Sequence, residues 1–334
     1  MNGLKEKNRP LWLALRKIKP LLYLAPFAVG VIVFSLYPIL NVLIMSFKKN
    51  YKYLTGAYDC FGLDNYTYVL KSRDFQNAIG ITFKYVLVAI PISMCLSIVI
   101  ATLLNKNIKL RAFFQTAYFL PMVTSVTAVG LTWKYMFNYK FGVINWLLEI
   151  LHIEPVNWLQ NPSANFWALA IYGIWSMMPF TIILLLSGLQ NIDPMFYTAA
   201  RVDGARDLRI FFRITVPLLS PTIFLVLIIN SISAFKVFNE LFPLFSGPGV
   251  GKNLYTMVYY IYDQFRGRTP PKYGYAAAAA IILFLIINSS SAFKVFNELF
   301  PLFSGPGVGK NHYTLVYYIY EQFRGRTPPK YQFY

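Results

Sequence analysis

The stretch Asn191–Ser220 reads NIDPMFYTAARVDGARDLRIFFRITVPLLS and lies between two long hydrophobic segments. It carries its own helix signals. Asp193 is a suitable N-cap, and Pro194 suits the first helical position. Gly204 can adopt the left-handed conformation that ends a helix. The stretch therefore predicts two short helices joined by a glycine turn.

The second of these helices is predicted to be amphipathic. One face carries Leu208, Phe211, Phe212 and Thr215, and another carries Arg206, Arg209 and Arg213. Pro217 and Pro221 are expected to mark the entry to the next membrane segment. Such an element suits docking into a groove on a partner protein. An amphipathic loop lying on lipid headgroups is the alternative, and the residues alone leave both readings open.

The composition indicates an integral membrane protein. Hydrophobic residues make up 57%, charged residues 13%, and the mean hydropathy is +0.48. A net charge of +18 would suggest nucleic acid in a soluble chain. Here many basic residues flank apolar segments, where they set topology and contact anionic membrane lipid, so no nucleic-acid partner is expected. Cys60 and Cys95 show no disulfide framework or metal-ligand spacing, and neither a metal nor a cofactor is expected.

About six membrane-spanning helices are predicted from the lengths of the apolar segments. They are Leu21–Phe47, Phe75–Leu104, Ala112–Phe137, Phe166–Leu189, Leu218 to about Phe242, and a last span that begins with Gly274–Ile287. A short amphipathic helix is expected around Val143–Leu151. The tail 1–20 holds six Lys/Arg, which favours a cytoplasmic N-terminus and a cytoplasmic 191–220 stretch. The outside loop Lys48–Asp74 holds five, so charge alone does not decide the orientation.

The spacing of the 191–220 stretch resembles a family motif. It is the cytoplasmic coupling motif of permease subunits of binding-protein-dependent ABC importers: Glu-Ala-Ala, three residues, Gly, nine residues, Ile-x-Leu-Pro. The matching residues are Ala199, Ala200, Gly204, Ile214 and Pro217. Thr198 stands where the motif has Glu, and Val216 where it has Leu. Three further stretches resemble the sugar-permease branch: Asp203-Gly204-Ala205, Phe61–Tyr66 and Tyr273–Ala276.

The resemblance implies an all-α membrane protein with the type I ABC importer permease fold, lying in the cell membrane. Its permease domain would cover 75–300, with the coupling loop at 191–217. It implies a second permease subunit, two ATP-binding cassette ATPase subunits and an extracytoplasmic solute-binding protein as partners. The ATPase-coupling residues would be Thr198, Ala199, Ala200, Asp203, Gly204, Ala205, Ile214 and Pro217.

By this resemblance the chain is no enzyme itself, because separate chains hydrolyse ATP while it carries a sugar, oligosaccharide or polyol. Two alternatives are a secondary transporter or other polytopic protein that works without ATPases, and a non-functional duplicated product. The coupling stretch discriminates between the classes, since a secondary transporter needs no docking element of that spacing.

The segment Ser246–Asn253, reading SGPGVGKN, imitates a phosphate-binding loop. A P-loop requires Gly, four residues, Gly-Lys and then Ser or Thr. Here the spacing is one residue short, and Asn253 replaces the hydroxyl. The segment is therefore interpreted as a Gly/Pro turn.

A polar stripe on the fifth span, formed by Asn230, Ser233 and Glu240, is the candidate substrate path. Charged groups at membrane depth usually line a cavity or pair with each other, and Lys236 lies four residues before Glu240. Trp175 and Phe180 of the fourth span are predicted to supply an aromatic face for a sugar ring. Hydrogen bonding between helices is the alternative for each polar residue.

The C-terminal part contains a near-identical duplication. Leu227–Tyr273 recurs as Leu285–Tyr331, with four differences in 47 positions. The second copy interrupts the sixth span and is interpreted as an aberrant tail. If the helix from Gly274 continues through Phe300, it is long enough to cross the bilayer with tilt, and the second loop 303–331 is cytoplasmic.

Overall fold

The computed structural model describes residues 23–105, 113, 116, 118, 120 and 122–303, with the backbone alone for 290–303. Its elements are helices, with one isolated antiparallel bridge between Lys48 and Phe61. The chain divides into two compact units, one of segments up to Leu70 and Gln264–Ile281, the other of Lys71–Asp263 and the chain from Ile282. The predicted tail 1–20, most of the predicted turn 105–111 and the second loop from 304 onward lie outside the described residues.

The first unit begins with a helix over Tyr23–Ser46, which contains the π turn η1 (Ile32–Leu36) and α2 (Tyr37–Ser46). Its 24 residues are long and apolar enough to cross a membrane, as predicted for the first span. A hairpin-like loop follows, in which the amide of Lys49 donates to the carbonyl of Cys60 and the amide of Asp59 to that of Lys49, both at 3.0 Å. The helix α3 (Asp64–Lys71) closes this segment.

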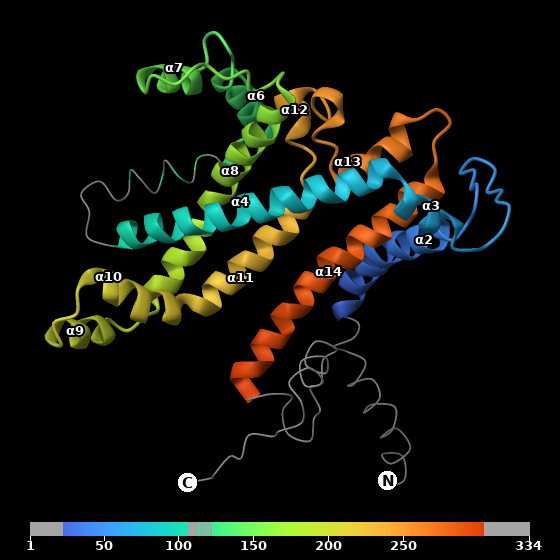
Figure 1. Cartoon of the computed structure of the whole chain (residues 1–334). Coiled ribbons are helices and arrows are strands. Elements are labelled where there is room, and N and C mark those ends of the chain that lie inside the picture. Colours follow the sequence, from blue (N-terminus) through green and yellow to red (C-terminus); the bar gives the residue numbers. More distant parts are fainter. Residues whose placement is uncertain are drawn as a thin grey trace, which may run out of the picture. The chain divides into compact units, whose positions relative to one another are not determined.

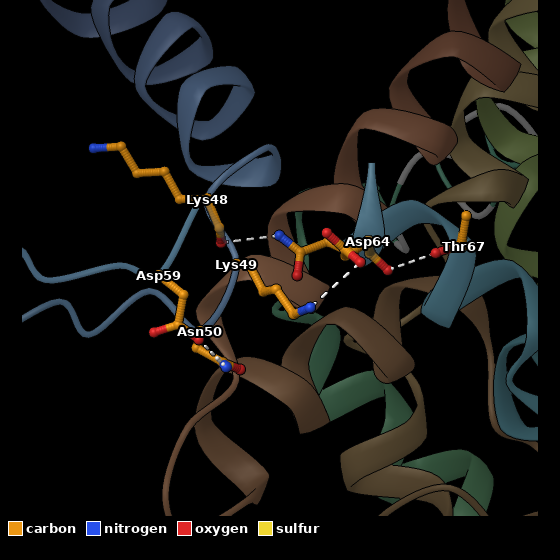
Figure 2. Close-up of polar contacts among 7 residues, drawn as sticks. Lys48, Lys49, Asn50, Asp59, Asp64 and Thr67 are labelled. Carbon is orange, nitrogen blue, oxygen red and sulfur yellow. Dashed lines mark hydrogen bonds and ion pairs between the residues drawn. The ribbon is translucent and has the colours of Figure 1, made fainter. Parts of the chain in front are cut away.

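Polar contacts fix the loop at the base of α3 (Figure 2). Nζ of Lys49 lies 3.4 Å from Oδ1 of Asp64, and Nδ2 of Asn65 donates to the carbonyl of Lys48 at 3.0 Å. Within the same unit, a Cβ placed on Gly274 would lie 2.7 Å from Nδ2 of Asn65. Two stretches that resemble the sugar-permease branch, Phe61–Tyr66 and Tyr273–Ala276, therefore pack against each other, and the glycine is what allows the approach.

The second unit is built around three long helices that pack against one another (Figure 1). They are α4 (Arg73–Asn105), α8 (Pro162–Gln190) and the helix Asp207–Phe235. Each is long and apolar enough to cross a membrane, so the second and fourth predicted spans are confirmed as helices of that kind. Packing between spans needs small residues for close approach. Gly188 of α8 is one, because a Cβ there would lie 2.6 Å from Oγ1 of Thr222.

The predicted bounds of the fifth span, Leu218 to Phe242, are wrong. The helix begins with α10 (Asp207–Ile210), continues through the π turn η2 (Phe211–Thr215) and ends with α11 (Val216–Phe235). Pro217 and Pro221 do not interrupt it. The π turn lies where the ring of Pro217 would otherwise meet the carbonyl of Arg213 in a regular α-helix.

Shorter helices complete the second unit. They are α6 (Val126–Met136), α7 (Val143–Ile150), α9 (Pro194–Val202), α12 (Leu241–Phe245), the 3-10 turn η3 (Val250–Lys252) and α13 (Met257–Tyr262). The π turn η4 (Asp263–Gly267) follows α13. The predicted amphipathic helix near Val143–Leu151 is confirmed as α7. The third predicted span, Ala112–Phe137, is described only in part, with α6 at its end.

The two copies of the duplicated sequence differ in backbone. The first copy leaves the helix after Phe235 and re-enters one at Leu241. In the second copy the equivalent residues belong to α14 (Tyr273–Phe303), a continuous helix of 31 residues. The sixth helix therefore does continue through Phe300, which is the condition under which it was expected to be long enough to cross the bilayer.

Two buried apolar clusters hold the second unit together. One includes Tyr85, Trp133, Leu169, Tyr172, Leu241 and Leu244. The other includes Met94, Leu104, Ile182, Leu185, Leu219 and Val226. Along α8 the last fully buried residue of the first cluster is Tyr172 and the first of the second cluster is Ile182; partly buried side chains such as Ile174 and Met178 pack against the two clusters between these positions.

Candidate functional site

A cavity of about 330 Å³ lies on the facing sides of α4, α8 and α11, beside the first cluster, to which its lining residues Tyr85, Tyr172 and Val237 belong. Its lining residues are Tyr85, Tyr172, Gly173, Ser176, Met177, Phe180, Ile229, Asn230, Ser233, Val237 and Glu240. The polar groups are three kinds of oxygen-bearing side chain: hydroxyls, a carboxamide and one carboxylate. Aromatic rings border them, so the lining offers both hydrogen bonds and apolar faces.

Four of the five residues predicted for the substrate path line this cavity: Phe180, Asn230, Ser233 and Glu240. Trp175 does not. It borders a separate cavity of about 280 Å³ with Trp133, whose ring centroid is 5.3 Å away. Trp175 and Phe180 are five residues apart, which on an α-helix places their side chains about 140° apart around the axis.

The sequence analysis missed Tyr85, Tyr172 and Ser176. For the latter two a signal exists, because Tyr172, Ser176 and Phe180 follow at intervals of four and share one face of α8. For Tyr85 no local signal exists. Its hydroxyl occupies the space beside Gly173, where a Cβ would lie 2.8 Å from Cζ of Tyr85. Only the packing of α4 on α8 brings these two residues together.

Asn230 takes part in a bond between helices, as the alternative interpretation expects. Its Nδ2 donates to Oγ1 of Thr181 at 2.9 Å, and its side chain is buried. Oγ1 of Thr181 in turn donates to the carbonyl of Met177 at 2.9 Å. This chain of bonds fixes the carboxamide of Asn230 at the edge of the cavity.

The predicted pairing of Lys236 with Glu240 is wrong, because the helix ends at Phe235 and the i, i+4 relationship is lost. Oε2 of Glu240 instead accepts a hydrogen bond from the amide of Phe238 at 3.1 Å. The lining of the cavity thus contains a single charged group, the carboxylate of Glu240. Within the described part of the chain, no group of His, Cys, Asp and Glu side chains is arranged to hold a metal ion.

The coupling stretch folds as the short helix α9 and a second helical segment around a glycine turn, as predicted, but the second segment is not a separate short helix because it begins the continuous helix Asp207–Phe235. Oδ1 of Asp193 accepts from the amide of Met195 at 2.8 Å, and Pro194 starts α9. Gly204 has φ +72°, and nothing lies within 4 Å of the position of a Cβ. The turn therefore selects glycine through its backbone conformation and not through lack of space.

Most of the predicted coupling residues lie at the surface of this element. Thr198, Ala199, Asp203, Gly204 and Pro217 are exposed, Ala200 is buried, and Ala205 and Ile214 are half-buried. Oγ1 of Thr198 donates to the carbonyl of Pro194 at 3.2 Å, so the residue that replaces the Glu of the motif is bonded within its own helix.

The residues of the predicted apolar face differ in exposure. Thr215 is buried, whereas Leu208 and Phe212 are 73% and 66% exposed, and Ile210, which was not assigned to this face, is also buried. The π turn at Phe211–Thr215 changes the angular spacing that an α-helix would give. The exposed surface consequently mixes apolar side chains with Arg206, Arg209 and Arg213.

The glycine-rich segment Ser246–Asn253 is confirmed as a turn. Ser246, Gly249 and Gly251 have positive φ angles, and the only helical piece within the segment is the three-residue η3. Nδ2 of Asn253 donates to the carbonyl of Pro162, where α8 begins. Nζ of Lys252 lies 5.2 Å from the ring of Tyr255. The segment therefore packs against the start of α8.

Comparison with known proteins agrees with this architecture. The family model "Binding-protein-dependent transport system inner membrane component" matches residues 93–298. The chain is 34% identical to the arabinooligosaccharides transport system permease protein AraP of Bacillus subtilis (strain 168), over 87% of this chain and 91% of that protein. It is 31% identical to the trehalose/maltose transport system permease protein MalF of Thermococcus litoralis, over 80% of this chain and 89% of that protein.

A solved structure shows the same fold. It is a bacterial alginate ABC transporter in complex with an alginate pentasaccharide-bound periplasmic protein, and one of its chains matches with a TM-score of 0.71 at 24% identity. The match covers 87% of this chain and 96% of that chain. The fold is therefore that of a type I ABC importer permease. From its sequence, its fold and its apolar helices, the chain belongs to the family of binding-protein-dependent transport system inner membrane components, as a multi-pass membrane permease subunit.

Proposed function

We propose that this permease carries a sugar, an oligosaccharide or a related polyol, and that the cavity between α4, α8 and α11 is its part of the path. The single observation that carries the proposal is the lining: hydroxyl, carboxamide and carboxylate groups beside Phe180 and two tyrosines. Polar groups of this kind bond to sugar hydroxyls, and aromatic rings cover the apolar face of a sugar ring. The names of the relatives, which refer to arabinooligosaccharides, trehalose and maltose, support this substrate class.

The energy for transport comes, in this proposal, from two separate ATPase chains that bind the exposed surface around α9, Gly204 and α10. The basic and apolar side chains exposed there suit docking into a groove. The N-terminus and this element lie in the cytoplasm. ATP binding closes the ATPase pair, the coupling elements move as levers, and the spans change between two packings that differ by a few kcal/mol.

Two further partners complete the proposed assembly. A second permease subunit supplies the other wall of the path. An extracytoplasmic solute-binding protein delivers the sugar; the alginate transporter, which was solved with its periplasmic protein, supports this part of the proposal.

The experiment is an uptake measurement in cells that express this chain with the transport genes of its own locus. Labelled arabino- and malto-oligosaccharides are the probes. Phe180→Ala is expected to raise KM about tenfold, equivalent to about 1.4 kcal/mol of lost stacking. Trp167→Ala is the matched control, because Trp167 lies on the same helix but is half-exposed and outside the cavity. Uptake of neither probe above that of cells lacking the chain, or an unchanged KM in Phe180→Ala, would contradict the proposal.

A further inference from the structure

The short helix α7 turns an apolar stripe outward. Val143, Trp146, Leu147 and Ile150 follow the i, i+3, i+4, i+7 spacing of one helix face. Their exposed fractions are 50%, 58%, 49% and 54%. A contiguous exposed apolar surface of this kind normally marks contact with a membrane or with another molecule.

The orientation of α7 is fixed by Asn145, whose side chain is buried on the opposite face. Its Nδ2 donates to the carbonyls of Tyr139 at 3.1 Å and Val156 at 3.0 Å. Its Oδ1 accepts from the amide of Val156 at 3.2 Å and from Nε1 of Trp158 at 2.8 Å. The carboxamide thus uses both its hydrogens and its oxygen, so the outward stripe is a built feature.

The same carboxamide connects α7 to its neighbours. The ring of Trp158 lies 5.7 Å from that of Phe137, which caps the end of α6. Val156 and Trp158 lead directly into α8. Asn145 therefore binds α7 to both the end of α6 and the beginning of α8.

Several observations indicate what covers the stripe. The exposed apolar surface is continuous along the chain from α6 to α7, through Tyr135, Tyr139 and Phe141, which are 75%, 50% and 82% exposed. In a membrane permease, exposed apolar side chains on the spans face lipid. The exposed apolar surface of α6 and α7 continues that lipid-facing surface along the chain. Tyr and Trp are also the residues most enriched where spans meet the headgroups. Figure 1 shows α7 at the end of α6, at the margin of the second unit.

We propose that α7 lies in the plane of the membrane surface and that lipid acyl chains cover Val143, Trp146, Leu147 and Ile150. The exposed carboxylates of Glu149 and Glu154 remain in water. The Asn145 contacts then hold the adjoining ends of α6 and α8 at one depth in the bilayer. This proposal rests on membership of the membrane family and is independent of the transported substrate.

The test uses the full chain, assembled with its partner subunits, in nanodiscs of phosphatidylcholine. In a background with Cys60 and Cys95 replaced by serine, bimane is attached at Leu147→Cys on the stripe or at Glu149→Cys on the polar margin. An apolar helix face lies roughly 5–10 Å into the headgroup and acyl boundary, within reach of a lipid that carries a nitroxide at acyl carbon 5. The label at position 147 is expected to lose about half its fluorescence to this lipid, and the label at 149 to be quenched mainly by iodide in water.

Three results would overturn the proposal. One is equal quenching of both positions by iodide, which would place the stripe in water. The second is a label at 147 that neither iodide nor the nitroxide lipid quenches, which would place a protein on the stripe. The third is protection of that label only after the solute-binding protein is added. Both labelled side chains are exposed, so neither substitution disturbs the packed interior.

Discussion

Nδ2 of Asn230 on α11 donates a hydrogen bond of 2.9 Å to Oγ1 of Thr181 on α8, and both side chains are buried. The bond lies beside the cavity, because Asn230 also lines it. It therefore connects the packing of two spans to the shape of the candidate path, and the two roles can be separated by substitution.

Replacing Thr181 with valine is expected to destabilise the permease by about 1 kcal/mol, because the carboxamide of Asn230 loses its partner in a buried position. The measurement is unfolding of the purified complex in a detergent series. The double variant Thr181→Val/Asn230→Leu is the control. It is expected to be less destabilised than the sum of the single variants, since no orphaned amide remains. Strictly additive effects would show that the bond contributes nothing.

Gly173 and Tyr85 form a second coupled pair. Gly173→Ala is expected to displace the tyrosine ring from the cavity and to destabilise the chain by about 1–3 kcal/mol, because a Cβ there overlaps the phenol. Adding Tyr85→Leu, which shortens the opposing side chain, is expected to restore the thermal stability of the complex. Failure of the second substitution to rescue the first would show that the glycine is needed for another reason.

Glu240 is the charged group of the cavity lining, and Glu240→Gln removes the charge while keeping an acceptor for the amide of Phe238. Hydrogen bonds to charged groups contribute about 1 kcal/mol more than neutral ones, so KM for a neutral oligosaccharide is expected to rise about fivefold. Glu149→Gln, an exposed carboxylate on α7, is the matched control. Equal KM values for Glu240→Gln and Glu149→Gln would show that Glu240 does not contribute to the substrate path.

Gly204 is predicted to be essential for coupling because of its φ of +72°. Gly204→Val should abolish uptake and substrate-stimulated ATP hydrolysis while the chain stays in the membrane, since a β-branched residue resists the left-handed region. Gly204→Asn is the control, because asparagine tolerates this conformation and open space surrounds the position. Wild-type uptake and ATPase stimulation in Gly204→Val would contradict the coupling role.

Local signals predicted the start of α9 and the glycine turn correctly, but not that the second helical segment continues into the next span. Asp193, Pro194 and Gly204 act through the backbone of their own neighbourhood, and their caps and turn appear as expected. Long apolar segments likewise predicted α4 and α8. Errors arose where an angle around a helix axis mattered. The choice of Trp175 instead of Tyr172 and Ser176 for the lining of the cavity is the example.

The duplication shows why some boundaries lie beyond local sequence. The same residues end a helix at Phe235 and continue one in α14. In the first copy the break is held by tertiary contacts: Val237 and Leu241 are buried, and Oγ1 of Thr256 donates to the carbonyl of Val237 at 3.0 Å. The prediction of a fifth span through Phe242 could not include these partners. Tyr85 was missed for the same reason, since it reaches the cavity from another span.

The central claim is that the transported sugar passes through the cavity between α4, α8 and α11. Ser233 is an exposed residue of the cavity lining, and Ser246 is an exposed residue that does not line the cavity. Each serine is replaced by cysteine in a background without Cys60 and Cys95. In the assembled transporter, the rate at which a small thiol reagent alkylates each cysteine is then measured. The measurement is made with and without the oligosaccharide that supports uptake. The account predicts that sugar slows the reaction at position 233 severalfold and leaves position 246 unchanged. Equal rates at position 233 with and without a sugar that is being transported would contradict it.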